Sequence, residues 1–137
     1  MKVLLIEDDV SIFDVICERF AQWNIDVIGP EDFQQIMVTF KKEEPQLVII
    51  DIQLPAFDGF HWCREIRAVS NVPILFLSSR DHPMDMVMAM QMGADDFVQK
   101  PFHTEVLIAK VQALLRRAYN YQETIQSDVE KWNGAEI

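Results

Sequence analysis

The distribution of apolar residues along the chain predicts alternating strands and helices. Nearly uninterrupted apolar runs at residues 2–6, 47–51 and 74–77 show no polar alternation, which is typical of strands covered on both faces in a parallel sheet. Two shorter segments, residues 25–28 and 95–99, are each followed within two residues by proline. These segments are also predicted to be short strands, and the proline that follows each one marks where it ends.

The segments between these strands carry apolar residues at three- and four-residue spacing, the stripe of an amphipathic helix. Helices are predicted at about residues 10–23, 31–42, 58–69, 82–92 and 104–119. Asp9 and Asp58 suit helix caps or turns, and Gly93 suits the position just after a helix end. Five strand–helix repeats predict an α/β fold, a doubly wound five-stranded parallel sheet with helices on both faces.

The periodicity fades near residue 120, which sets the predicted domain boundary. Residues 1–119 are expected to form one domain, and residues 120–137 a linker leading into the start of a second domain. The chain of 137 residues carries a formal charge of -10, which argues against binding a nucleic-acid backbone by itself. No apolar run is long enough for a membrane span and no leader precedes the first strand, so we expect a cytoplasmic protein.

Polar residues stand where four of the strands end, and these residues carry the candidate chemistry. Because the carboxyl ends of parallel strands share one edge, Glu7, Asp8, Asp51, Ser78 and Lys100 are predicted to lie on one rim. Crowded carboxylates repel each other or bind a cation, and oxygen ligands favour a hard ion such as Mg²⁺. With the ion bound, Asp51 could attack phosphorus while Ser78 and Lys100 hold the phosphoryl oxygens.

Four motifs together resemble the receiver domain of two-component response regulators over residues 1–119. They are Ile6-Glu7-Asp8-Asp9, Asp51-Ile52-Gln53-Leu54-Pro55 with Asp58-Gly59, Leu77-Ser78-Ser79-Arg80, and Gly93-Ala94-Asp95-Asp96-Phe97 with Lys100-Pro101-Phe102. The resemblance implies a flavodoxin-like (βα)5 fold with strand order 2-1-3-4-5. It also implies a phosphorylation-dependent signalling switch rather than an enzyme that releases a product.

The resemblance assigns the metal and acceptor roles. Asp51 is implied to be the phosphoacceptor. Glu7, Asp8 and Asp51 are implied to hold Mg²⁺ together with the backbone carbonyl of Gln53.

The resemblance also assigns the residues that respond to the phosphoryl group. Ser78 matches the switch hydroxyl, Phe97 the switch aromatic that changes rotamer, and Lys100 the lysine that contacts phosphate. The peptide bond between Lys100 and Pro101 is implied to be cis.

Within the family, the Arg-rich end of the last helix and the following segment resemble the OmpR/PhoB subfamily. This implies a winged-helix DNA-binding domain beyond residue 120 and a membrane histidine kinase as phosphodonor. The sequence around Trp62-Cys63-Arg64 and residues 71–80 is most similar to regulators that answer antimicrobial peptides and cell-envelope stress in Gram-positive bacteria.

Methionine occupies every second position from Met84 to Met92. A period of two spreads side chains around a helix, so some must face water, where methionine often marks an adaptable contact surface. The subfamily dimerises through its fourth helix, fifth strand and fifth helix. The implied dimer face contains Met86, Met90, Asp95, Asp96, Val106, Ile108, Lys110 and Arg117, with Asp96–Lys110 and Asp95–Arg117 at salt-bridge positions. Met86 and Val106 stand where relatives often carry a charge pair, which predicts a more apolar dimer.

Three other interpretations stay open at this point. A small Mg²⁺-dependent phosphohydrolase would use a similar Asp, Ser and Lys, but normally has a second acid where this chain has Gln53. A flavodoxin-like nucleotide or FMN binder would need a Gly/Ser/Thr-rich phosphate loop after the first strand, where this chain has acidic residues. A pseudo-receiver would act by protein binding alone.

Overall fold

The computed structural model describes residues 1–80 and 82–120. Its five strands are β1 (Lys2–Ile6), β2 (Asp26–Ile28), β3 (Leu47–Asp51), β4 (Ile74–Ser78) and β5 (Asp96–Gln99). All neighbouring strands pair in parallel, in the order β2-β1-β3-β4-β5. This confirms the predicted fold and strand order. The segment at 121–137, predicted to be a linker and the start of a second domain, lies outside the described residues.

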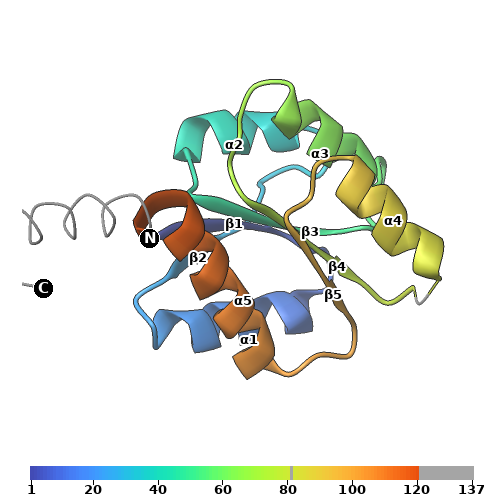
Figure 1. The fold of residues 1–137 in the computed structure, drawn as a ribbon. Helices are drawn as coiled ribbons and strands as arrows, with labels where there is room; N and C mark the ends of the chain where they lie inside the picture. The colour runs from blue at the N-terminus through green and yellow to red at the C-terminus, as the bar shows by residue number, and fades with distance from the viewer. Residues whose placement is uncertain (81, 121–137) are drawn as a thin grey trace, which may run out of the picture.

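Helices cover both faces of the sheet (Figure 1). They are α1 (Val10–Ala21), α2 (Ile36–Glu43), α3 (Gly59–Arg67), α4 (Pro83–Gln91) and α5 (Thr104–Leu115), with a π-helical turn at Arg116–Asn120. Helices α2, α3 and α4 lie on one face, and α1 and α5 lie on the other. No helix in the described part of the chain is long and apolar enough to cross a membrane.

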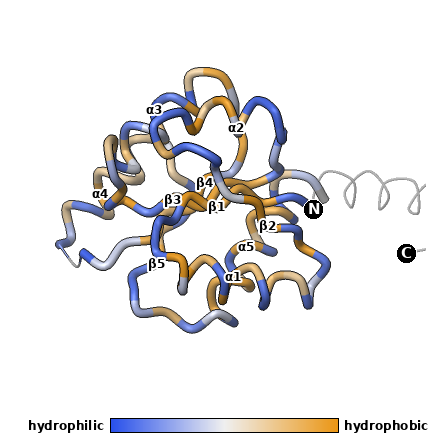
Figure 2. The backbone as a smooth tube through the Cα atoms, turned by 180° about the vertical axis from the view of Figure 1, so that it is seen from behind, coloured by the Kyte–Doolittle hydropathy of each residue, from blue (hydrophilic) through white to orange (hydrophobic). Residues whose placement is uncertain are grey.

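The apolar strands form the centre of two core layers, one on each face of the sheet (Figure 2). In β1, Leu4 and Ile6 belong to the layer under α2 and α3, whereas Val3 and Leu5 belong to the layer under α1 and α5. Such alternation follows from the two-residue period of a strand. Because both layers are apolar, the strand ends are the places where polar side chains gather.

Capping interactions set where most helices begin and end. The Asp9 carboxylate accepts hydrogen bonds from the backbone of α1, and Asp58 does the same for α3. Gly93 has a φ of 102° just after the C-cap of α4, a backbone conformation that favours glycine. Helix α2 differs from the prediction, because it begins at Ile36 rather than near residue 31. Asp32 accepts from the backbone amides of the next turn and holds that segment outside the helix.

The end of the described chain is tied to the amino-terminal edge of the sheet. The Tyr119 hydroxyl donates to the backbone carbonyl of Gln46, just before β3, at 2.7 Å. The Gln46 side chain in turn accepts from the backbone amide of Lys2 at 2.6 Å. Asp51 stands at the other end of β3, so Tyr119 lies at the edge of the sheet opposite Asp51.

Candidate functional site

The parallel sheet brings residues from four strand ends to one rim. Glu7 directly follows β1, Asp51 ends β3, Ser78 ends β4 and Lys100 directly follows β5. Since these strands are neighbours in the sheet, their polar ends converge although they are far apart in sequence. The structure therefore brings the predicted rim residues together.

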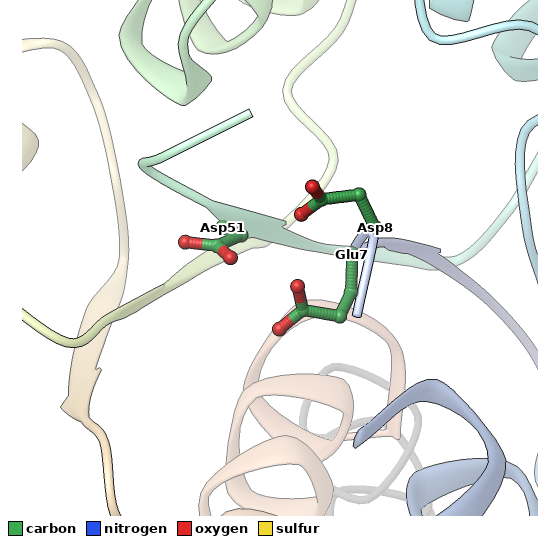
Figure 3. A group of neighbouring side chains, drawn as sticks. All are labelled: Glu7, Asp8 and Asp51. Carbon is green, nitrogen blue, oxygen red and sulfur yellow. The ribbon is translucent and has the colours of Figure 1, made fainter. Parts of the chain in front are cut away.

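Glu7, Asp8 and Asp51 form an acidic cluster at this rim (Figure 3). One carboxylate oxygen from each residue lies within 4.8 Å of the others. Glu7 and Asp51 are buried, whereas Asp8 is exposed, so an ion could reach the cluster from solvent on the Asp8 side. A donor set made only of carboxylate oxygens, with one open side, fits a hard divalent cation that keeps several waters.

Lys100 supplies the positive charge of the site. Its ammonium donates to Glu7 Oε1 at 2.5 Å and to Asp51 Oδ2 at 3.0 Å. Burial lowers the pKa of Lys100, but the hydrogen bonds to the two carboxylates outweigh that effect and raise the pKa above its usual value. Lys100 thus stays charged and holds Glu7 and Asp51 on either side of itself.

Burial also changes the ionisation of Glu7. It raises the pKa of Glu7 to about 7, helped by the neighbouring Asp51 and opposed by the hydrogen bond from Lys100. The acidic cluster therefore carries a proton-binding group that titrates near neutral pH. A bound cation would compete with that proton.

The loop after β3 fixes the orientation of Asp51. The backbone amide of Gln53 donates to Asp51 Oδ1 at 3.0 Å, so both Asp51 oxygens have a partner. Gly59 packs against the backbone at the end of β3, where a Cβ would overlap the carbonyl oxygen of Asp51. The Asp58-Gly59 pair therefore combines a helix cap with a close backbone approach that only glycine allows.

The remaining predicted site residues lie around the acidic cluster. Ser78 is fully buried, and its Oγ accepts from the backbone amide of Arg80 at 3.0 Å. Phe97 is half-buried in β5 and packs against the core layer under α2 and α3. The peptide bond between Lys100 and Pro101 is cis.

The residues of the predicted dimer face differ in exposure and in the contacts that they make within the chain. Ile108 is 6% exposed and belongs to the core under α1 and α5, so it offers almost no surface to a partner. Asp95 accepts from Arg67 of its own chain at 2.9 Å, and its predicted pairing with Arg117 in a dimer stays a prediction. Asp96 and Lys110 also pair within the chain, at 3.2 Å.

The methionines of α4 lie mostly in solvent, as their spacing predicted. Met84, Met86, Met88 and Met90 are each at least 43% exposed, and Val87 is 42% exposed. The same helix buries Asp85 and Ala89. Sequence reasoning missed Asp85 and its ion pair with Arg80, because an Asp three residues into a helix is normally a solvated first-turn acid.

A profile of the response regulator receiver domain matches residues 3–112 of this chain. Over 136 residues the chain is 60% identical to the sensory transduction protein BceR of Bacillus subtilis, covering 99% of this chain and 58% of that protein. It is 57% identical over 121 residues to the response regulator protein GraR of Staphylococcus aureus, covering 88% of this chain and 54% of that protein. The chain thus spans about half the length of these curated relatives.

Solved structures agree with this assignment. The N-terminal domain of the nisin resistance regulator NsrR, described as a lantibiotic response regulator, superposes with a TM-score of 0.78 at 39% identity, covering 84% of this chain and 97% of that one. The activated receiver domain of Klebsiella pneumoniae RstA gives 0.81 at 31% identity, covering 85% and 99%. These relatives are consistent with the OmpR/PhoB subfamily and the Gram-positive group that the motifs indicated. The chain belongs to the response regulator receiver domain family.

Proposed function

We propose that this domain is a phosphorylation-controlled switch in which Asp51 accepts a phosphoryl group from a membrane histidine kinase. The observation that carries the proposal is the position of Asp51, buried at a strand end beside the Lys100 ammonium and the Glu7 and Asp8 carboxylates. A lone carboxylate there would repel a phosphoryl group. Here a fixed ammonium and a cation-binding cluster offset that repulsion.

The side chains at the rim divide the transfer chemistry between them. An Asp51 oxygen forms the new P–O bond as the P–N bond of the kinase phosphohistidine breaks, and the released imidazole takes a proton from water. Mg²⁺, held by Glu7, Asp8, Asp51 and the Gln53 backbone carbonyl, would offset the charge of the phosphoryl oxygens. Lys100, already 3.0 Å from Asp51 Oδ2, is placed to hold another phosphoryl oxygen, and the Ser78 hydroxyl a third.

The output of the switch is proposed to be dimerisation through α4, β5 and α5. The exposed methionines supply an apolar contact surface, and Asp95 and Asp96 are engaged within their own chain. A dimer would then control a DNA-binding domain beyond residue 120, which fits the greater length of the curated relatives. The switch would operate in the cytoplasm, with Phe97 changing rotamer on phosphorylation.

The first test is intact mass after incubation with Mg²⁺ and acetyl phosphate. We expect one added phosphoryl group in the wild-type chain and none in Asp51→Ala or without Mg²⁺. Asp14→Ala, which removes an exposed acid on α1, is the matched control and should be phosphorylated normally. An adduct that persists in Asp51→Ala would refute Asp51 as the acceptor.

The same assay separates the switch from the alternatives. A phosphohydrolase would hydrolyse a generic phosphate ester rapidly and many times per chain. The switch should instead show one slow phosphorylation per chain. A pseudo-receiver would take up no phosphoryl group from any donor. The assignment to the receiver family favours the switch over the phosphohydrolase, and the acidic cluster with Lys100 beside Asp51 favours it over the pseudo-receiver.

A further inference from the structure

Three side-chain contacts tie the turn after β4, meaning Ser79 and Arg80, to its surroundings. Ser78 Oγ accepts from the Arg80 backbone amide at 3.0 Å, and Ser79 Oγ donates to Gln53 Oε1 at 3.1 Å. The Arg80 guanidinium donates to Asp85 Oδ1 of α4 at 2.7 Å. Arg80 is therefore linked at its backbone to the Ser78 hydroxyl, at the end of the strand that pairs with β3, and at its side chain to α4.

The partner of Arg80 is an unusual acid for the surface of a helix. The Asp85 side chain is 7% exposed, while that of Arg80 is 45% exposed. Among the described residues, no group donates to Asp85 Oδ2. Arg80 is thus the cation that compensates a carboxylate otherwise buried beneath α4, and a buried carboxylate without a partner is strongly unfavourable.

This arrangement links the position of the turn to the position of α4. If the turn moves and takes the Arg80 guanidinium with it, Asp85 must either follow or become accessible to water, because it cannot stay buried alone. Either response moves α4. A serine hydroxyl can donate to a phosphoryl oxygen and still accept from the Arg80 amide, so Ser78 can draw the turn toward Asp51 without breaking the link.

We propose that Arg80 and Asp85 are a positioning pair through which the phosphorylation state of Asp51 sets the position of α4. The inference rests on the proposed function and adds to it a route from the acceptor to the output helix. Neither residue touches the reacting atoms. Their removal should therefore leave phosphorylation intact and weaken only its consequence for α4.

The test compares wild type with Arg80→Gln, Asp85→Asn and the double variant, each with and without Mg²⁺ and beryllofluoride, a phosphoryl analogue. The first readout is hydrogen exchange of the α4 amides at low protein concentration. The second is the ratio of dimer dissociation constants without and with the analogue. We expect a ratio of at least about tenfold in wild type, within the usual range of coupling between sites, and below about threefold in all three variants.

The double variant separates coupling from stability. Removing both charges leaves no unpaired buried carboxylate, so its unfolding temperature should recover relative to Arg80→Gln, yet its dimer ratio should stay low. Lys2→Gln removes an ion pair with Glu43, 3.2 Å long, at the opposite edge of the sheet. This control should keep the wild-type ratio.

The outcomes distinguish the two proposals. If wild type responds to beryllofluoride and Asp85→Asn responds equally while only its unfolding temperature falls, the pair is merely structural and the inference is refuted. If intact mass shows no acyl phosphate on Asp51 and beryllofluoride changes neither readout in wild type, the proposed function fails and the inference fails with it.

Discussion

Lys100 Nζ lies 2.5 Å from Glu7 Oε1, although the two residues are separated by 93 positions in the chain. The Glu7 side chain is fully buried and the Lys100 side chain is 14% exposed. The ammonium thus occupies one oxygen of a carboxylate that belongs to the acidic cluster. We therefore expect Lys100 to stabilise the metal-free site and to compete with metal binding to it.

Replacing Lys100 should make the fold depend on the metal. We expect Lys100→Met to lower the free energy of unfolding by about 2 kcal/mol without Mg²⁺, because two buried carboxylates lose their charged donor. Added Mg²⁺ should raise the unfolding temperature more in the variant than in wild type. Thermal unfolding across a Mg²⁺ titration measures both effects. Lys2→Met, an equal change at the other edge of the sheet, should show neither, and equal Mg²⁺ gains in all three proteins would contradict the competition.

The pKa of Glu7 predicts a pH dependence of metal binding. Its value of about 7 in the folded protein lies above the usual 4.5, so Glu7 is protonated below neutral pH and a metal must displace the proton. Mg²⁺ affinity should fall by up to about tenfold per pH unit below pH 7 and level off above it. Calorimetric titration between pH 5.5 and 8.5 would show this, and Glu7→Gln should bind more weakly with a flatter profile.

In the metal-free protein, the contribution of Glu7 to the free energy of unfolding should fall as pH rises, whereas its contribution to Mg²⁺ affinity rises. A folded-state pKa raised above the unfolded value means that the folded chain holds a proton that the unfolded chain releases. The resulting stabilisation is fully present below about pH 4.5 and is lost as pH rises through about 7. Urea unfolding in the presence of a chelator should therefore show the Glu7 contribution decreasing from pH 5 to pH 8, whereas Glu7→Gln removes it. An identical pH dependence in the two proteins would contradict the Glu7 assignment.

The methionines of α4 should determine dimer strength. Alanine at both Met86 and Met90 is expected to raise the dissociation constant of the beryllofluoride-loaded dimer by about tenfold or more, because each truncation removes buried apolar area from the interface. Alanine at Met84 and Met88 is the matched control, since these residues have similar exposure but lie on the opposite flank of the helix at 100° per residue.

Sedimentation at two salt concentrations would complete that comparison. Because the ion pairs of Asp95 and Asp96 lie within one chain, the dissociation constant should depend only weakly on salt. Equal constants for wild type and the Met86, Met90 variant would remove the methionine face from the proposal.

Gly59 should be intolerant of a side chain for a local reason. In Gly59→Ala the new Cβ would overlap the carbonyl oxygen of Asp51, so the end of β3 must shift at a cost of about 1–3 kcal/mol. Phosphoryl uptake from acetyl phosphate should slow as well. Gly29→Ala is the control, because its Cβ would meet only the ring edge of Phe13, which can move. If Gly59→Ala has the same free energy of unfolding in urea as wild type, the close approach of Gly59 to Asp51 does not limit the side chain at this position.

The sequence was sufficient to place the rim because one rule governs it. Parallel strands end at a common edge, so Glu7, Asp51, Ser78 and Lys100 had to converge once their strands were identified. The core positions of α5 follow from spacing in the same way, because Leu107, Val111 and Leu114 recur at three- and four-residue intervals and are buried. These inferences depend on backbone periodicity, which the amino-acid pattern carries directly.

The features that sequence reasoning missed depend on side-chain competition. The contact of Asp95 with Arg67, whose guanidinium is held by the carbonyl oxygens of Val72 and Gly93, is seen only in the fold. Val10 and Trp23 fit the predicted apolar stripe but are 70% and 56% exposed, because Val10 is the first residue of α1 and Trp23 lies beyond its end at Ala21. The burial of Asp85 has no signal in the spacing of polar residues.

The hydrogen bond from Tyr119 to Gln46 holds the end of the described chain at the start of β3. Asp51 and Tyr119 lie at opposite ends of β3. Under the proposed function, a phosphodonor at Asp51 and a domain attached beyond residue 120 would occupy different ends of the sheet, and Asp51 could be phosphorylated while that domain stays attached. Phosphorylation and readout would then overlap in time, instead of waiting for one protein to leave before the next arrives.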